Sequence, residues 1–493
     1  MQIVANEDSP LDDLAKVATQ RAMAADGVRL NSPSKWADYT DPVALPYTST
    51  LAANCVSYLR DLIRLDTSNP PGNEIIAADY IAGLLKNSGI EPVVIETAPK
   101  RGNVIARLKG DGTSAPLLLY SHTDVVPVEP DQWTVEPFGG VEQDGFVYGR
   151  GALDMKGITA MQLAVFLALG ASGADLRRDV IFAATADEET DANLGIGVLV
   201  ERHPELLRAE YALSEFGGAS TYVGSHCFYP IQTAEKGNVW MRMIARGKPG
   251  HGSVPHADNA VVHLSRAIDK LAKARLPMIA TRTAGAYITG IADAIGGGQG
   301  IALRAWLDME ALHDVPLHRL ITDQALAAEL HAITHNTVVP TGLRGGYKAN
   351  VIPSSVEATL DCRTLPGYDA PALIEELRGV LGEDAQHIDF EVDSSGVAVE
   401  FPVDTPLYRL IGQTIRQHDP HGIPLPYMLS GATDAKHVAK LGTICYGFSP
   451  LKFAPGGSFF DLVHGNDERV AVSALAWGVR VLEDVVRQCA TQT

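Results

Sequence analysis

Residues 117–127 (LLLYSHTDVVP) place His122 and Asp124 directly after a short apolar run. Four to eight apolar residues in a row are typical of a buried strand, and open α/β sheets place their functional sites at the carboxyl ends of such strands. At a spacing of two residues, both side chains leave the same face of an extended segment. One of them can therefore bind a metal ion while the other orients it. Taken alone, however, a histidine at the end of a strand is more often an ordinary structural residue.

The sequence around this segment alternates short strands with helices. Runs of β-branched and aliphatic residues predict strands at 93–96, 103–108, 116–120, 180–184 and 211–214. Helical periodicity is found at 51–65, 75–88, 157–169 and 196–202, and the turn NPPGN at 69–73 follows the first of these helices. This alternation is typical of an α/β fold with a mostly parallel sheet covered by helices.

A different pattern begins at about residue 237. Strands are expected at 238–246, 346–352, 355–362 and 387–392, and helices at 260–273 and 370–381. The order β–α–β–β–α–β favours a small ferredoxin-like α+β domain with one exposed sheet face. Residues 277–342 are interpreted as an insertion within this domain, and their glycine-rich stretch 296–300 is expected to be flexible.

The length of the chain favours more than one domain, because 493 residues are too many for one compact core. The α/β pattern resumes after the ferredoxin-like segment and continues to a helix near the C-terminus. The sequence therefore predicts an N-terminal extension at 1–47, a first part of the main domain at 48–236, an inserted domain at 237–395 and a second part of the main domain at 396–493.

The charge of the chain argues against several classes of partner. It has 40 Lys and Arg residues against 59 Asp and Glu residues, which gives a net charge of −19. An acidic surface repels phosphate backbones and anionic lipids, so neither nucleic acid nor a membrane is an expected partner. The first residues lack the pattern of a signal peptide, and no apolar run approaches the ~18 residues of a membrane span. We expect a cytoplasmic protein whose five cysteines, which form no CxxC pair, are reduced thiols.

Four further segments place carboxylates or a histidine after strands or in turns. Asp154 lies in the glycine-rich GRGALDMKG, where it could also be the N-cap of a helix. Glu188 and Glu189 belong to a run of three carboxylates, which repel one another unless water or cations neutralise them. Glu215 follows a predicted strand, and His464 lies in VHGNDE before the last helix.

Together, these five segments resemble the metal-binding pattern of the aminoacylase, carboxypeptidase and succinyl-diaminopimelate desuccinylase family of co-catalytic dizinc peptidases. The resemblance extends from about residue 51 to the C-terminus, and residues 122–127 and 149–157 are its most specific parts. Within the family, the chain is most similar to the carboxypeptidase S and N-acyl amino acid hydrolase branch. The resemblance implies a zinc-peptidase-like α/β domain and an inserted lid domain through which a homodimer forms.

The resemblance also implies a centre of two divalent metal ions, with zinc as the first choice and cobalt or manganese as alternatives. Asp154 would bridge the two ions. One ion would also bind His122 and Glu215, and the other would bind Glu189 and His464. Imidazole and carboxylate ligands without thiolates suit Zn²⁺.

In the same family pattern, Glu188 would be the general base and Asp124 would orient His122. The ions would lower the pKa of a shared water and polarise the scissile carbonyl. Glu188 would take the proton of that water and pass it to the leaving nitrogen. The chain departs from the pattern at two places: the glycines that often follow the glutamate pair are absent, and Phe216 stands where a glycine is common.

The inserted domain supplies most of the substrate-binding residues that the resemblance implies. His251, in GKPGHGSVPH, would donate a hydrogen bond to the developing oxyanion, commonly from a partner subunit. Asn350 and Arg363 match other lid positions, and the planar guanidinium of Arg363 suits a substrate carboxylate. The backbone at Gly431, in SGATDAK, would contact the same carboxylate. Each of these residues could instead be a loop or strand-end residue without a functional role.

The implied activity is hydrolysis of an amide bond beside a free carboxylate, in a dipeptide, at the C-terminus of a peptide or in an N-acyl amino acid. A catalytically silent metal-binding relative, acting as a binding or scaffold protein, is the alternative, although such a relative would be expected to lose a ligand or the base. The sequence has no HExxH motif of a single-metal peptidase and no evident G-x-S-x-G motif of a serine hydrolase.

Overall fold

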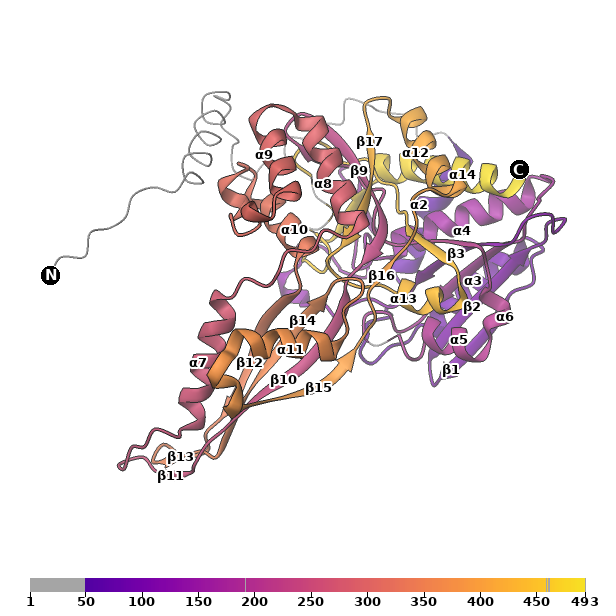
Figure 1. Ribbon diagram of the computed structural model, residues 1–493. Helices are drawn as coiled ribbons and strands as arrows, with labels where there is room; N and C mark the ends of the chain where they lie inside the picture. The colour runs from indigo at the N-terminus through magenta and orange to yellow at the C-terminus, as the bar shows by residue number, and fades with distance from the viewer. Residues whose placement is uncertain (1–48, 191, 458, 460–461, 493) are drawn as a thin grey trace. The chain divides into compact units, whose positions relative to one another are not determined.

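The computed structural model of the protein describes residues 49–492, with the exceptions of 191, 458 and 460–461 (Figure 1). The predicted extension at 1–47 lies outside the described residues. The described chain divides into two compact units. The first unit contains residues 234–400 and 428–432, and the second contains residues 49–233, 401–427 and 433–492.

The second unit is built on a mixed sheet. In spatial order its strands are β1 (Val93–Ala98), β2 (Arg101–Leu108), β6 (Val180–Thr185), β3 (Leu117–His122), β7 (Tyr211–Ser214), β18 (Ile444–Gly447) and β9 (His226–Glu235). The four central strands, β6, β3, β7 and β18, run parallel to one another. Strands β2 and β9 pair with this centre in antiparallel fashion, and β1 pairs with β2 in the same way. The predicted α/β fold is confirmed, and the parallel part of the sheet is its centre.

Helices pack against this sheet and against one another. Their bounds are α2 (Thr50–Ile63), α3 (Ile75–Asn87), α4 (Lys156–Ala171), α5 (Ile196–Arg202), α6 (Pro204–Leu207), α12 (Pro406–His418), α13 (Ala435–Val438) and α14 (Val472–Thr491). Helix α4 contacts β3 and β6 of the sheet as well as α2 and α14 (Figure 1). Because it has neighbours on several sides, nearly every residue of α4 is buried, which explains its apolar composition all around the helix.

A small three-stranded sheet brings two distant loops together in the second unit. It consists of β4 (Val141–Gln143), β5 (Phe146–Tyr148) and β19 (Arg469–Ala471), with β5 in the middle. Directly after β5, the amide of Gly149 donates to the carbonyl of Glu468 at 2.9 Å. The glycine-rich turn that contains Asp154 therefore lies beside the loop that contains His464. The remaining short elements are η1 (Pro130–Gln132), β8 (Thr221–Val223), β17 (Ile423–Leu429) and η5 (Ala439–Leu441).

The first unit contains a four-stranded antiparallel sheet. In spatial order its strands are β12 (Thr337–Gly345), β14 (Ser355–Thr364), β10 (Gly237–Arg246) and β15 (Ile388–Ser395). Helices α7 (Ala260–Lys273) and α11 (Ala370–Leu381) share a buried core with one face of this sheet, which includes Val239 and Met241 of β10. The side chain of Trp240 lies on the other face and is 39% exposed. Along the chain, these strands and helices follow one another in the predicted order β–α–β–β–α–β, and the order of the strands in the sheet is that of a ferredoxin-like domain.

Two local predictions for this unit were wrong. The strand expected at 346–352 is not formed as a whole: only β13 (Val351–Ile352) lies there, paired with β11 (Gly250–His251), and β12 takes the place in the sheet. Pro340 and the glycines of β12 hide its alternation, and the pairing with β14 is irregular between Pro340 and Gly342. A strand with such residues is hard to recognise from sequence.

The glycine-rich stretch that was expected to be flexible begins a helix instead. The insertion folds into α8 (Arg282–Ile295), α9 (Gly297–Asp308), η2 (Glu310–Leu312), η3 (Leu317–Arg319) and α10 (Gln324–Thr334). A Cβ atom at Gly300 would lie 2.3 Å from the carbonyl oxygen of Ala292, so glycine permits the close contact of α9 with α8. The unit also contains η4 (Gly382–His387) and β16 (Val399–Glu400).

All five cysteines lie within the described residues and are free thiols, as predicted. No helix among the described residues is both long and apolar enough to cross a membrane.

Candidate metal centre

The five side chains that were predicted as metal ligands lie together in the second unit. They form two groups that share Asp154. In the first group, Nε2 of His122 lies 3.2 Å from Oδ1 of Asp154 and 3.5 Å from Oε2 of Glu215. In the second group, Nε2 of His464 lies 3.3 Å from Oδ2 of Asp154 and 3.3 Å from Oε2 of Glu189. The two oxygens of one carboxylate thus face two different groups.

These distances suit two metal ions. Two ligands that are each about 2.1 Å from a tetrahedral ion lie about 3.4 Å apart, which agrees with the 3.2–3.5 Å that separate the ligand atoms here. Three protein ligands for each ion would leave a further position open for water or substrate, as in catalytic zinc sites. The geometry and the donor atoms therefore fit a pair of divalent ions.

The fold explains why these side chains meet. His122 is the last residue of β3, and Glu215 follows the last residue of β7. Glu189 lies four residues after the end of β6. Because β3, β6 and β7 run parallel, their carboxyl ends lie at the same edge of the sheet. Asp154 and His464 reach this edge through the loops that flank the three-stranded sheet.

Asp154 does not cap the helix that follows it. The N-cap of α4 is Met155, which makes no side-chain capping bond. The carboxylate of Asp154 instead faces His122 and His464, whose hydrogen bonds hold its pKa below the ordinary value against the opposing effect of burial. The alternative interpretation of Asp154 as a helix cap is therefore wrong.

The electrostatics of the cluster also favour cations. Burial, together with the neighbouring Asp154, raises the pKa of Glu189 to about 7. Burial raises the pKa of Glu215 as well. Hydrogen bonds to Asp154 and Glu189 raise the pKa of His464 to about 10. Among the described residues, the buried Oε1 atom of Glu189 has no hydrogen-bond partner. Carboxylates that must take up protons to relieve burial and repulsion would be stabilised by bound cations.

Glu188 lies at the edge of this cluster. Its Oε2 atom is 3.9 Å from Nε2 of His122, and its side chain is 14% exposed. Burial and the nearby Glu215 raise its pKa well above the ordinary value. A carboxyl group with a raised pKa beside a metal site is suited to exchange protons near neutral pH.

Asp124 has more partners than the prediction assigned to it. Nδ1 of His122 lies 3.0 Å from the backbone carbonyl of Asp124 and 3.5 Å from its carboxylate. The carboxylate accepts hydrogen bonds from the amides of Glu188, at 3.1 Å, and Glu189, at 3.0 Å. It also accepts a bond of 2.8 Å from Nδ2 of Asn69. Asp124 therefore contacts both the imidazole and the loop with the two glutamates.

Sequence reasoning did not identify Glu468 and Arg150, which connect two of the ligand loops. The buried carboxylate of Glu468 accepts hydrogen bonds from the amides of Gly151, Leu153 and Asp154, at 3.1, 2.7 and 3.1 Å. It also accepts a bond of 2.7 Å from the guanidinium of Arg150. Arg150 in turn donates to the carbonyl of His464 at 3.2 Å. The acidic pair Asp467 and Glu468 was the available signal, but it was noted only as part of the loop around His464.

Asp434 is a second buried carboxylate that was not identified. Burial raises its pKa well above the ordinary value; Lys436 opposes this effect and Glu215 adds to it. Its Oδ1 atom has no hydrogen-bond partner among the residues that the structure describes. The loop SGATDAK was singled out from the sequence, but for the backbone of Gly431. The carbonyl of Gly431 accepts a hydrogen bond of 3.2 Å from the amide of Lys236, within the first unit.

The three predicted lid residues belong to the first unit. His251 lies in β11 and is exposed; its Nδ1 atom is 2.7 Å from the hydroxyl of Ser253. Asn350 is also exposed, and its carbonyl accepts a bond of 2.9 Å from the amide of Gly252. Arg363, in β14, makes two hydrogen bonds of 2.8 and 3.1 Å to the carboxylate of Asp361, two residues earlier. The substrate-binding roles of these residues stay predictions.

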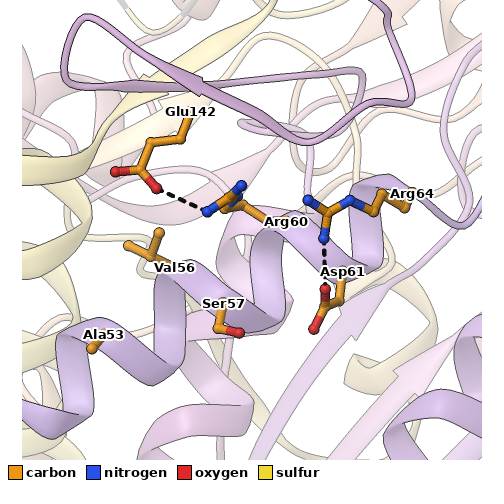
Figure 2. Close-up of a pocket in the computed structure, with 7 residues that line it drawn as sticks. All are labelled: Ala53, Val56, Ser57, Arg60, Asp61, Arg64 and Glu142. Atoms are coloured by element: carbon orange, nitrogen blue, oxygen red, sulfur yellow. Dashed lines mark hydrogen bonds and ion pairs between the residues drawn. The ribbon is translucent and has the colours of Figure 1, made fainter.

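A pocket of about 240 Å³ lies on the second unit, lined by residues of α2, by Arg64 directly after this helix and by Glu142 of β4 (Figure 2). Its charged groups are already paired. Arg60 contacts Glu142 at 3.1 Å, and Arg64 contacts Asp61 at 2.8 Å (Figure 2). None of the predicted site residues lines this pocket, so it does not compete with the metal cluster as a candidate active site.

Two imidazole–carboxylate groups that share one aspartate at the edge of an α/β sheet are suited to a metal-dependent hydrolase. The family model described as "Peptidase family M20/M25/M40" matches residues 118–488 of the chain. The chain therefore belongs to this family, and it is a metal-dependent hydrolase that acts on amide bonds.

Relatives of known name support this assignment. Aminoacylase-1 of Sus scrofa is 27% identical over 444 residues, which cover 88% of this chain and 95% of that protein. The N-fatty-acyl-amino acid synthase/hydrolase PM20D1 of Mus musculus is 26% identical over 411 residues, which cover 80% of this chain and 78% of that protein.

Solved structures share the fold. The M20 family metallo-carboxypeptidase Sso-CP2 from Sulfolobus solfataricus has a TM-score of 0.65 at 18% identity, covering 88% of this chain and 98% of that chain. Human carnosine dipeptidase 1 has a TM-score of 0.63 at 16% identity, covering 90% and 97% of the respective chains.

Proposed function

We propose that the protein hydrolyses an amide bond beside a free carboxylate, in an N-acyl amino acid, a dipeptide or the C-terminal bond of a peptide. The observation that carries this proposal is the position of Asp154, whose two oxygens lie 3.2 and 3.3 Å from the imidazoles of two separate ligand groups. The names of aminoacylase-1 and PM20D1 describe enzymes of acylated amino acids, and carnosine dipeptidase 1 is by name a dipeptidase. Among the three substrate classes, N-acyl amino acids are therefore the first to test.

The proposed centre holds two divalent ions, with zinc as the first choice. His122, Asp154 and Glu215 would hold one ion, and Asp154, Glu189 and His464 would hold the other. When bound, two such ions lower the pKa of a water and polarise a carbonyl oxygen. Hard carboxylate oxygens with imidazole nitrogens fit zinc, and they also accept cobalt or manganese.

Glu188 is proposed as the general base. Its carboxylate lies at the edge of the ligand cluster, and its amide is held by Asp124 at 3.1 Å. A base in this position takes a proton from the attacking water and returns it to the leaving nitrogen. Burial and the nearby Glu215 raise the pKa of Glu188, which makes its carboxylate a stronger base toward the attacking water. No covalent intermediate with the chain is required.

The alternative is a metal-binding relative without activity. Such a protein would be expected to lack the base or a ligand, yet Glu188 and all five ligand residues are present. The presence of the full set favours a hydrolase. A homodimer formed through the first unit stays a prediction from the family resemblance.

Removal of metal is expected to abolish hydrolysis. The test is a panel of N-acyl amino acids and dipeptides, assayed before and after chelation and after addition of Zn²⁺, Co²⁺ or Mn²⁺. Because metal ions contribute several kcal/mol to the transition state, chelation should reduce turnover by more than about 100-fold, and at least one of the three ions should restore it. Turnover that survives complete removal of metal would contradict the proposal, as would a metal-loaded protein that hydrolyses no member of the panel.

A further inference from the structure

A buried arginine lies behind the loop that contains Glu188 and Glu189. We propose that Arg101 is a positioning residue for hydrolysis, because its guanidinium holds this loop through Asp187 and through Asn69. The inference rests on the proposed function, in which Glu188 is the base and Glu189 a metal ligand. Arg101 itself would contact neither substrate nor metal.

The guanidinium of Arg101 is surrounded by acceptors. Arg101 is the first residue of β2 and is 4% exposed. Its NH2 group contacts the carboxylate of Asp187 and lies 3.0 Å from that of Glu74. Its NH1 group donates to Oδ1 of Asn69 at 3.1 Å and to the carbonyl of Pro71 at 2.9 Å. A planar group with several donors in fixed directions can satisfy all of these acceptors at once.

Glycine at position 72 makes this arrangement possible. A Cβ atom there would lie 1.4 Å from NH1 of Arg101, and the φ angle of Gly72 is +84°, which side chains rarely adopt. The turn NPPGN therefore wraps closely around the guanidinium. It was recognisable in the sequence as the end of the first helix, but its contact with Arg101 was not.

Asp187 connects Arg101 to the loop of the two glutamates. It lies two residues after the end of β6 and has a φ angle of 73°, in the left-handed region that Asp tolerates better than most residues. Its carboxylate accepts hydrogen bonds from the hydroxyl of Thr190 at 2.7 Å and from the amide of Leu194 at 2.9 Å. Asp187 thus ties both ends of the segment in which Glu188 and Glu189 lie, and Arg101 holds Asp187.

Asn69 provides a second connection. Its Oδ1 atom accepts from Arg101, and its Nδ2 group donates to the carboxylate of Asp124 at 2.8 Å. Asp124 in turn accepts the amides of Glu188 and Glu189 at 3.1 and 3.0 Å. Two chains of hydrogen bonds therefore run from one guanidinium to the loop of Glu188 and Glu189, and a contact of 3.3 Å between Nδ2 of Asn69 and the carboxylate of Asp187 joins them. A small shift of this pair would misplace the base relative to the water and the carbonyl, and such misplacement costs about 100-fold in rate.

The test compares kcat, KM and metal content of Arg101→Lys and Arg101→Met with those of the parent at saturating zinc. Lysine keeps the charge but lacks the planar fork. We expect kcat to fall by at least about 10-fold in Arg101→Lys and by about 100-fold in Arg101→Met, with KM within threefold and two ions per chain retained. A loss of structure alone would also lower the apparent kcat at unchanged KM, but it would lower the melting temperature and the metal content as well. The value of kcat is therefore referred to the folded chains that hold two ions.

Arg107→Met is the matched control. Arg107 lies in the same strand, but its guanidinium makes an ion pair of 3.0 Å with Asp179 and donates to the carbonyls of Glu205 and Leu206, away from the loop of Glu188. Its replacement should leave kcat within twofold of the parent. Equal losses in Arg107→Met and Arg101→Met would overturn the proposal.

A double variant separates positioning from folding. Arg101→Met leaves the buried carboxylate of Asp187 without its cation, which can prevent folding, whereas Arg101→Met combined with Asp187→Asn removes both charges of this pair. Because Arg101 acts in part through Asp187, the fold loss of kcat in the double variant should be smaller than the product of the losses in Arg101→Met and Asp187→Asn, and Arg101→Lys replaces Arg101→Met in this comparison if Arg101→Met does not fold. The proposal would be overturned if the loss of kcat in the double variant equalled the product of the two single losses. It would also be overturned if kcat of Arg101→Lys stayed within threefold of the parent.

The same measurements keep this inference distinct from the proposed function. Turnover that is lost in Glu188→Gln but kept in Arg101→Met rejects the role of Arg101 only. Full turnover in both Glu188→Gln and Arg101→Met rejects the role of Glu188, and with it the reason for positioning this loop.

Discussion

Replacing Glu188 by glutamine is expected to leave the fold and both metal ions in place while kcat falls by about 10²–10⁴-fold, the usual contribution of a general base. Glutamine has the shape of glutamate but cannot take up the proton of a water. Glu188 lies 3.9 Å from His122 and is not a member of either ligand group, so its neutralisation should not remove a metal ligand. The measurement is steady-state turnover together with metal content and melting temperature.

The neighbouring glutamate is the matched control for this variant. Glu189→Gln changes the same chemical group one residue along the chain, but Oε2 of Glu189 lies 3.3 Å from His464 within a ligand group. It should therefore lower the metal content, and its activity should recover in part at high zinc concentration. Activity of Glu188→Gln above about one tenth of the parent value would reject Glu188 as the base.

The ends of the central strands were predictable because local sequence determines them. The apolar runs before His122, Glu189 and Glu215 are short, and helices separate them, so a parallel sheet with these residues at one edge follows from sequence pattern alone. The bounds of β7 and α5 agree with the predicted ranges, because the apolar pattern of each element stops at the residues that flank it.

The supporting contacts of the site were not predictable in this way. Arg101 and Asp187 are 86 residues apart, and Glu468 lies 314 residues after Asp154. An arginine at the start of a strand or a glutamate before a helix has the sequence appearance of a solvated residue. Only the fold shows that both are buried and that several amides converge on Glu468. Strand β12 was not recognised for another reason. It lies at the edge of its sheet, and Pro340 together with the glycines of this strand interrupts the alternation of apolar and polar residues that is typical of a strand.

Replacing Asp154 by alanine is expected to weaken the binding of both metal ions, because the two oxygens of this one carboxylate face both ligand groups. Without it, each ion would keep only two protein ligands, His122 with Glu215 and His464 with Glu189. Loss of a residue that merely orients a ligand costs about 10–100-fold in metal affinity, so loss of a shared ligand should cost more than about 100-fold at each site. Titration with zinc under competition from a chelator of known affinity measures both sites, and turnover should fall in parallel.

Two comparisons show whether the carboxylate is shared. His464→Ala removes a ligand from the second group only, so it should release one ion and leave the other bound with an affinity close to that of the parent. Asp61→Asn removes an aspartate of the same unit whose side chain pairs with Arg64 outside the cluster, and it should change neither affinity. If Asp154→Ala kept one ion at the parent affinity, the carboxylate would serve a single ion. The proposed hydrolysis by two ions acting together would then lose its structural basis, because nothing else among the described ligand residues belongs to both groups.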